Sequence, residues 1–149
     1  MTDLEWKRQY SVGHREFDND HKILYIIFQR LKEMNLKIKN LDQIEEEYIS
    51  YSLNQLVQYT NQHFKDEENY MLKYDFPGYK NHKRSHDRLR KNLDKLVCRY
   101  QLEGPCVLLP LVDFLEIWWE SHILNEDRRY AEYIDEGLYP DHSLCVEVG

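Results

Sequence analysis

Apolar residues recur at intervals of three and four positions in four long segments of the chain, which is the spacing of amphipathic α-helices. The expected helices span residues 18–40, 42–75, 79–103 and a last segment that starts between 105 and 110 and ends near 133. Long amphipathic helices with short connections are typical of antiparallel bundles. The pattern therefore predicts one all-α domain over 1–149. We expect an up-down-up-down four-helix bundle at 18–133, an N-terminal arm at 1–17 and a short C-terminal tail at 134–149.

Local signals set the ends of these helices. Asp18 and Asp42 suit the N-cap positions of the first two helices, because a short acidic side chain accepts hydrogen bonds from the first turn. The segment Phe76-Pro77-Gly78 should end the second helix. Pro110 is either a first-turn residue of the fourth helix or a kink in a longer one. The arm is expected to pack across the outside of the bundle through Trp6, Tyr10, Val12 and Phe17.

Composition narrows the class of protein further. Only five glycines and four prolines occur among 149 residues, which favours long helices over short strands. The net charge of −7 argues against nucleic acid or an anionic membrane surface as a partner. No apolar run approaches the ~20 residues that span a bilayer, and the polar N-terminus does not resemble a signal peptide. The three cysteines, Cys98, Cys106 and Cys145, lack metal-finger spacing, so we expect a cytoplasmic protein with reduced thiols.

Every predicted helix carries histidine on or near its apolar face. One inward histidine is more often structural than ligating, and this is the simpler interpretation for His21 taken alone. Two buried neutral imidazoles without a partner, as predicted for the pair on the third helix, would be costly unless a metal ion bound them. The inward-facing residues are His21 on the first helix, His63 and Glu67 on the second, His82 and His86 on the third, and His122 on the fourth.

Spacing leaves the carboxylate of the fourth helix open. Glu126 lies four residues after His122 and is in phase with it. Asp127 lies five residues after His122, which is about 140° further around an ideal helix. An Asp127 carboxylate would have to reach around the helix to meet the same site.

Antiparallel packing brings these inward residues to one end of the bundle. Five histidines with one or two carboxylates would crowd a single ion, so two metal ions are expected. Imidazole and carboxylate without thiolate suit iron, and also manganese or zinc. Asp66 and Glu68 flank Glu67 and are expected to point elsewhere, while His14 and His142 are most simply surface residues.

At these motifs the chain resembles the hemerythrin family, specifically its single-domain bacterial members. The matching segments are Tyr10-Ser11-Val12-Gly13, Asp18-Asn19-Asp20-His21-Lys22, His63-Phe64-Lys65-Asp66-Glu67-Glu68, Phe76-Pro77-Gly78, His82-Lys83-Arg84-Ser85-His86 and His122-Ile123-Leu124-Asn125-Glu126-Asp127. A departure beside a ligand position is Asp20, where the family often has Gln or Glu.

The resemblance implies a non-haem di-iron centre, with an oxo or hydroxo bridge, that binds O₂ reversibly. By this resemblance one iron is held by His82, His86 and His122, the other by His21 and His63, and both by the bridging Glu67 and Asp127. The resemblance thus selects Asp127 over Glu126. The second iron has fewer protein ligands, which implies an open position for O₂. Candidates for lining a dry apolar O₂ pocket are Leu24, Phe28, Leu115, Trp118, Trp119 and Ile123.

The resemblance favours an O₂-binding protein for storage, delivery or supply. One alternative is an O₂-sensing signalling subunit that acts on a separate partner chain. Another is a di-iron oxidase, peroxidase or nitric oxide reductase, which would need an electron donor from outside. Ferritin-like oxidases use Glu-x-x-His pairs, and no Glu stands three residues before any histidine here. The histidine-rich site therefore favours O₂ binding over enzymatic turnover.

Overall fold

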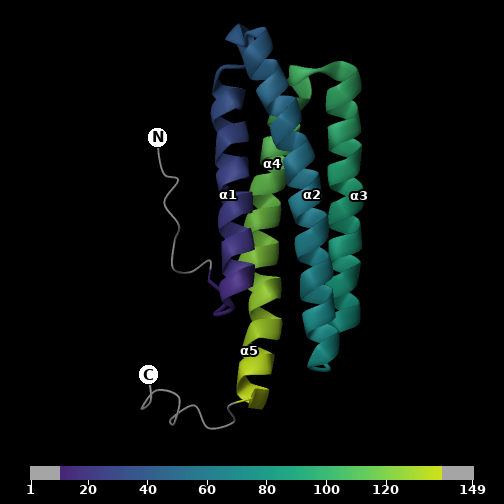
Figure 1. Cartoon of the computed structure of the whole chain (residues 1–149). Coiled ribbons are helices and arrows are strands. Elements are labelled where there is room, and N and C mark those ends of the chain that lie inside the picture. Colours follow the sequence, from purple (N-terminus) through teal and green to yellow (C-terminus); the bar gives the residue numbers. More distant parts are fainter. Residues whose placement is uncertain (1–10, 139–149) are drawn as a thin grey trace.

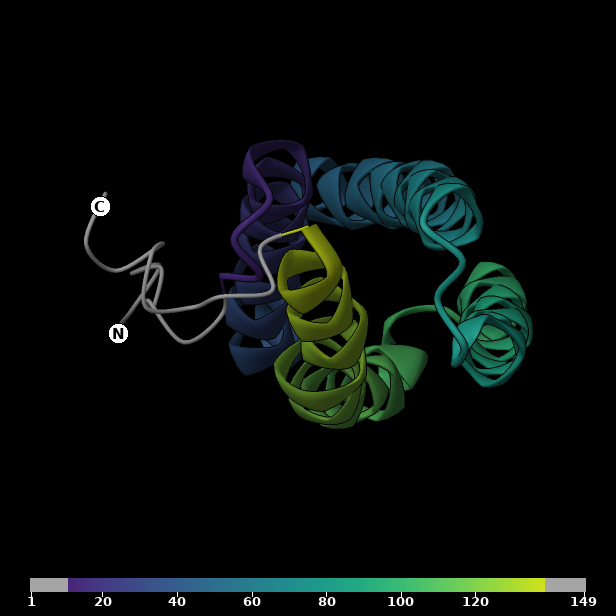
Figure 2. The same ribbon diagram turned by 90° about the horizontal axis from the view of Figure 1, so that it is seen from below.

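The computed structural model describes residues 11–138, apart from the side chains of Leu124 and of residues 135–138. The elements are α1 (Arg15–Leu36), η2 (Ile38–Asn40), α2 (Gln43–Lys73), α3 (Tyr79–Glu103), η3 (Pro105–Val107), α4 (Leu108–Trp118), η4 (Trp119–Glu126) and α5 (Asp127–Leu138). Successive helices run antiparallel (Figure 1), and α4, η4 and α5 follow one another directly as one long fourth rod. Figure 2 shows the four rods arranged around a common interior. The expected all-α four-helix bundle is confirmed.

Local sequence signals explain most helix ends. Asp42 caps α2 through a capping box, in which its carboxylate accepts from the Glu45 N–H at 2.7 Å and the Glu45 carboxylate accepts from the Asp42 N–H. Gly104 ends α3 with a φ of 82°, a left-handed conformation that favours glycine. Pro110 is the third residue of α4, where its missing N–H costs nothing, so it is a first-turn proline and not a kink.

The start of α1 differs from the sequence-based expectation. The helix begins at Arg15, and its N-cap is His14, whose Nδ1 accepts a hydrogen bond from the Phe17 N–H. Asp18 is already inside the helix. Its carboxylate accepts hydrogen bonds from the Ser11 hydroxyl and the Val12 N–H, and so ties the preceding segment to the first turn. The predicted N-cap at Asp18 is therefore wrong, and His14 has a structural role at the helix start.

The fourth rod also extends beyond its expected end. α5 continues to Leu138, five residues past the predicted end, because Ile134 is buried in the core and supports a further turn. Cys98 and Cys106 are exposed free thiols. Trp6 and Tyr10 of the arm lie outside the described residues, as do His142, Cys145 and the rest of the tail from 139. Between residues 11 and 138, none of the helices has the length and apolar character required to span a bilayer.

Two apolar clusters fill the bundle on either side of a buried polar layer. On α1, His21 lies between Phe17 of the smaller cluster and Leu24 of the larger one. α2 and the fourth rod run in the opposite direction to α1, so along them the larger cluster comes first. On α2, Glu67 lies between Phe64 of the larger cluster and Met71 of the smaller one. On the fourth rod, Asp127 lies between Ile123 and Tyr130 in the same way. Burial of each large apolar side chain contributes about 1.5–3 kcal/mol, so the clusters hold the polar layer in place.

Candidate metal centre

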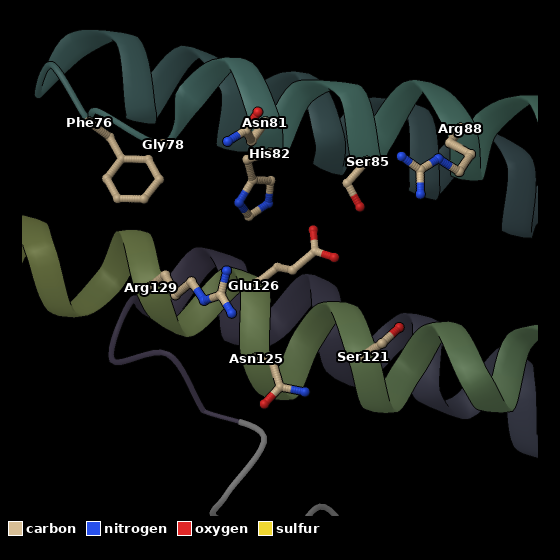
Figure 3. Close-up of a pocket in the computed structure, with 10 residues that line it drawn as sticks. All are labelled: Phe76, Gly78, Asn81, His82, Ser85, Arg88, Ser121, Asn125, Glu126 and Arg129. Carbon is tan, nitrogen blue, oxygen red and sulfur yellow. The ribbon is translucent and has the colours of Figure 1, made fainter.

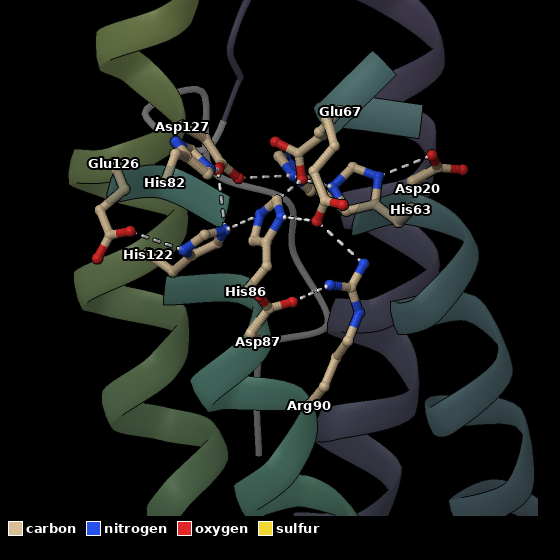
Figure 4. A network of polar contacts seen from close by, with 12 residues as sticks. Asp20, His63, Glu67, His82, His86, Asp87, Arg90, His122, Glu126 and Asp127 are labelled. Atoms are coloured by element: carbon tan, nitrogen blue, oxygen red, sulfur yellow. Dashed lines mark hydrogen bonds and ion pairs between the residues drawn. The ribbon is translucent and has the colours of Figure 1, made fainter. Parts of the chain in front are cut away.

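All seven side chains expected from the sequence as metal ligands converge in this polar layer. Figure 4 labels all of them except His21. They come from all four rods, and none exposes more than 5% of its surface. They are His21, His63, Glu67, His82, His86, His122 and Asp127. Burial of so many ionisable groups is costly unless they are paired or bind a metal.

The ligating atoms form two groups that share their carboxylates. One group contains His82, His86 and His122, the other contains His21 and His63, and Glu67 and Asp127 belong to both. Within each group, one potential ligand atom per residue lies within 4.8 Å of all the others. The arrangement can therefore accept two cations side by side, with the two carboxylates between them.

Distances between imidazole nitrogens also fit metal binding. His21 Nε2 lies 2.9 Å from His63 Nε2, and His86 Nε2 lies 3.0 Å from His122 Nε2. Two nitrogens bound at right angles to one metal, each at about 2.1 Å, would lie about 3.0 Å apart. The nitrogens thus converge on one point in each group.

The two central carboxylates lie close to the same nitrogens. Glu67 Oε1 is 2.7 Å from His63 Nε2 and 3.9 Å from His86 Nε2. Asp127 Oδ1 is 3.0 Å from His122 Nε2, and Asp127 Oδ2 is 3.2 Å from His21 Nε2. These approaches are short but lack hydrogen-bond angles, since all four carboxylate oxygens have no hydrogen-bond partner in the described part of the chain. A pair of metal ions would satisfy these buried oxygens, so the residues fit such a group.

The ionisation of the metal-free site is consistent with displacement of protons by metal. Burial acts to lower the pKa of His63, but the charge of Glu67 and hydrogen bonds outweigh it and raise the pKa to about 10. Burial opposes the same change at His122, where Asp127 raises the pKa to about 10. At His86, burial prevails over the attraction of Glu67 and lowers the pKa to about 2. Without metal, protonated imidazoles therefore balance the central carboxylates.

Three further carboxylates orient the histidines from outside the centre. Asp20 Oδ2 lies 2.8 Å from His63 Nδ1, and Glu68 Oε2 lies 2.7 Å from His86 Nδ1. The third pair joins Glu126 Oε2 to His122 Nδ1 at 3.2 Å. A proton held on each Nδ1 leaves the Nε2 lone pair facing the centre, which is the tautomer that binds metal.

The role of Glu68 corrects the expectation that it points away from the site. Glu68 is 9% exposed, and its carboxylate oxygen Oε2 lies 2.7 Å from His86 Nδ1 and 3.0 Å from the guanidinium of Arg90. Arg90 also bonds Asp87. Asp66, in contrast, is exposed as expected and bonds Gln62 on the same helix. Only one flank of the acidic run is therefore solvated.

A π-helical segment explains how Asp127 reaches the centre. η4 is a π-helix, and the Asp127 N–H at its end donates to the carbonyl oxygen of His122, five residues earlier. The wider turn moves residue i+5 towards the phase that residue i+4 has in an α-helix. Asp127 consequently faces the centre, and Glu126 reaches the outer nitrogen of His122.

Aromatic rings pack directly on the histidines. Phe64 stacks on His86 with centroids 3.9 Å apart and an interplanar angle of 5°. Trp118 lies parallel to His122 at 6.0 Å, whereas Trp119 meets His21 edge-on at 6.4 Å. The two tryptophans therefore cover different halves of the site.

The six residues expected to line an apolar pocket are all buried in the larger cluster. Leu115 and Trp118 line a void of about 10 Å³, together with Thr60, whose hydroxyl has no hydrogen-bond partner in the described residues. A void of this size is about one water-sized probe. The assignment of all six residues to an O₂ pocket stays a prediction.

Sequence reasoning missed the outer carboxylates. Helical spacing does signal the contact of Glu126 with His122, four residues earlier, but it does not show that Glu126 meets the outer nitrogen. Asp20 pairs with His63 on another helix, and Glu68 pairs with His86 across the α2–α3 turn. No local pattern signals those two contacts.

Comparison with known proteins identifies relatives of this chain. The profile of the family described as "Hemerythrin HHE cation binding domain" matches residues 12–134. The bacteriohemerythrin of Clostridium acetobutylicum is 27% identical over 129 residues, which is 85% of this chain and 98% of that protein. The bacteriohemerythrin of Pseudomonas aeruginosa is 28% identical over 93% of this chain and 86% of its own length. The myohemerythrin of Sipunculus nudus is 26% identical over 84% of this chain and 88% of its own length.

Proposed function

The chain belongs to the hemerythrin family, and on that premise we propose that it binds O₂ reversibly at a pair of iron ions in the buried polar layer. The observation that carries the proposal is the sharing of Glu67 and Asp127 by two groups of histidine nitrogens. Such sharing suits two adjacent metal ions bridged by carboxylates, and nitrogen and oxygen donors without sulfur suit iron.

We propose the following ligands. His82, His86 and His122 would hold one iron, and His21 with His63 would hold the other. Glu67 and Asp127 would bind both ions. The group with two histidines has one protein ligand fewer, so the open position for O₂ is proposed on the side of His21 and His63.

A pair of ferrous ions held by these residues would supply the two electrons that reversible O₂ binding requires. The protein residues supply the surroundings. Asp20, Glu68 and Glu126 fix the histidine rings with Nε2 towards the centre. The apolar clusters above and below the layer exclude water and offer few protons, which favours release of O₂ over its reduction.

Storage, delivery or supply of O₂ is the proposed role. The sensing and enzymatic alternatives each need a partner, either a signalling chain or an electron donor, and they stay predictions from the sequence. The cytoplasmic location also stays a prediction. The carrier role is favoured because histidines outnumber carboxylates in the centre and apolar residues enclose it.

Exposure of the ferrous protein to O₂ tests the proposal. A coloured form that becomes colourless again when O₂ is removed would support a carrier. Rapid conversion to a ferric form, accelerated by an added reductant, would contradict reversible binding and favour an oxidase or a sensor.

Iron analysis of two variants tests the ligand assignment separately. His63→Ala should remove the iron of the two-histidine group, and Glu67→Ala should weaken both ions. Two irons retained per chain in both variants would contradict the assignment.

A further inference from the structure

A cleft of about 460 Å³ lies outside the metal centre, between α3 and the η4–α5 segment (Figure 3). Its volume is within the range of about 300–1,000 Å³ that is usual for small-molecule sites. His82 lies in this cleft, whereas the other four histidines of the centre do not line it. The cleft therefore gives a solvent-borne molecule access to one proposed ligand of the iron.

The outer nitrogen of His82 distinguishes it from its two neighbours in the three-histidine group. His82 Nε2 lies 2.9 Å from Asp127 Oδ1, so this nitrogen faces the centre and Nδ1 is the nitrogen left for the cleft. Nδ1 of His86 meets Glu68, and Nδ1 of His122 meets Glu126. Among the described residues, no carboxylate plays this part for His82. Within the three-histidine group, His82 is therefore the one histidine without an outer carboxylate among the described residues.

Two arginines line the cleft, one at each end. Arg129 projects into the cleft from α5, and Arg88 projects from α3 at the other end (Figure 3). Neither arginine forms an ion pair within residues 11–134, where side chains are described. The carboxylate of the cleft, Glu126, is already bonded to His122. The cleft thus has two guanidinium groups and one engaged carboxylate, in a chain whose net charge is −7.

Neutral polar groups complete the lining. On the α3 side near His82, the Asn81 amide can donate hydrogen bonds to an oxyanion, whereas the Ser85 hydroxyl already hydrogen-bonds the Glu126 carboxylate. Guanidinium groups bind carboxylate and phosphate oxygens through charge-assisted hydrogen bonds. An inorganic oxyanion would fill only part of the volume of about 460 Å³, which leaves room in the cleft for an organic part.

We propose that the cleft binds a small organic anion, whose carboxylate or phosphate accepts a hydrogen bond from His82 Nδ1 and pairs with Arg129. The bound anion takes the place that Glu68 and Glu126 hold for the neighbouring histidines. A carboxylate or phosphate in that place raises the basicity of the imidazole. The bound anion therefore favours the ferric state and lowers the reduction potential of the centre. This consequence rests on the proposed function, but the binding itself does not.

Calorimetry on the iron-loaded full chain tests the binding, with inorganic phosphate, AMP and citrate as separate probes. AMP or citrate should bind with a Kd in the millimolar range or tighter, and more tightly than inorganic phosphate. Arg129→Gln and Arg88→Gln should each weaken binding about tenfold, because each removes a charge-assisted hydrogen bond. The control is Arg30→Gln on α1, an exposed arginine outside the cleft whose loss changes the net charge equally.

Two calorimetric results would overturn the proposal. One is that neither organic probe binds more tightly than inorganic phosphate. The other is that Arg30→Gln weakens binding as much as Arg129→Gln, which would indicate a general charge effect.

The reduction potential tests the proposed contact with His82 separately. Saturation with the tightest probe should lower the reduction potential of the iron-loaded protein, and Arg129→Gln should abolish this shift. An unchanged potential with an arginine-dependent Kd would contradict the His82 contact. If the iron-loaded protein bound no O₂ reversibly, the proposed function would fail while the calorimetric binding would stand.

Discussion

Asp127 and His122 are joined twice, once through the backbone and once through their side chains. The Asp127 N–H donates to the His122 carbonyl oxygen five residues earlier, and Asp127 Oδ1 lies 3.0 Å from His122 Nε2. In an α-helix the residue in phase with His122 would be Glu126. The π-helical turn therefore decides which of two adjacent carboxylates enters the metal centre and which supports it from outside.

The first prediction follows from this division of roles. Asp127→Ala removes a carboxylate shared by both groups, so iron content should fall below one ion per chain. Glu126→Gln keeps an oxygen that can accept the His122 Nδ1–H, so about two ions should remain. Iron is measured by colorimetric assay after gel filtration, and circular dichroism checks that both variants fold. Equal iron contents in the two variants would refute the assignment.

The second prediction concerns the outer carboxylate of the two-histidine group. Asp20→Ala frees His63 Nδ1 and should lower iron affinity about 10–100-fold. Asp66→Ala is the matched control, because Asp66 is exposed on α2 and bonds only Gln62 among the described contacts. Competition with a graded chelator measures both affinities. A loss of similar size in the control would mean that general charge, and not the His63 contact, is responsible.

The third prediction concerns pH and metal removal. In the metal-free protein the pKa values of His63 and His122 are raised to about 10 from 6.5. A raised pKa stabilises the fold fully below 6.5, and that stability is lost as pH rises through about 10. Iron binding requires deprotonated imidazole and therefore gains strength as pH rises. The difference in Tm between iron-loaded and metal-free protein should widen from pH 6 to pH 9.

Thermal melts at matched ionic strength measure this difference. The lowered pKa values of Glu67 and Asp127 act only on the acid side, below about pH 4.5, where protonation removes their stabilising contribution. They do not affect the interval from pH 6 to 9. A Tm difference that stayed constant or narrowed over that interval would contradict the protonation scheme.

The fourth prediction separates the two tryptophans. Trp119 packs near His21, on the side proposed for O₂, and Trp118 lies parallel to His122 on the other side. Trp119→Leu should admit water near O₂ and accelerate autoxidation about tenfold, while Trp118→Leu should change it much less. Both variants leave a buried cavity and should lose a few kcal/mol of stability. The rate of colour loss in air measures autoxidation. A faster rate in Trp118→Leu than in Trp119→Leu would contradict the proposed open position on the side of His21.

Local features of the fold could be predicted because their causes are local. Asp42 caps α2 and Gly104 ends α3, each through a residue whose conformational preference acts over one turn. α2 ends at Lys73, shortly before the expected stop at Phe76-Pro77-Gly78, and Asp75 between them has a left-handed φ of 52°. Asp18 was misassigned because its partners, Ser11 and Val12, fold back onto it from before the helix. A capping residue and a residue that anchors a preceding segment look alike in sequence.

The centre itself was predicted in outline, and its outer shell was not. Inward histidines are visible as periodicity, whereas the contact of Asp20 with His63 depends on how α1 packs against α2. Spacing also could not choose Asp127, because an α-helical period was assumed where the structure has a π-helix. Only the family resemblance selected the correct carboxylate for the interior.

Repeated oxygenation of the ferrous protein, with O₂ uptake and iron measured together, tests the central claim most directly. The account predicts one O₂ taken up for every two irons, full release under vacuum, and the same uptake over successive cycles. Uptake that is not recovered on evacuation, or a stoichiometry that requires only one iron per O₂, would contradict reversible binding at a paired centre.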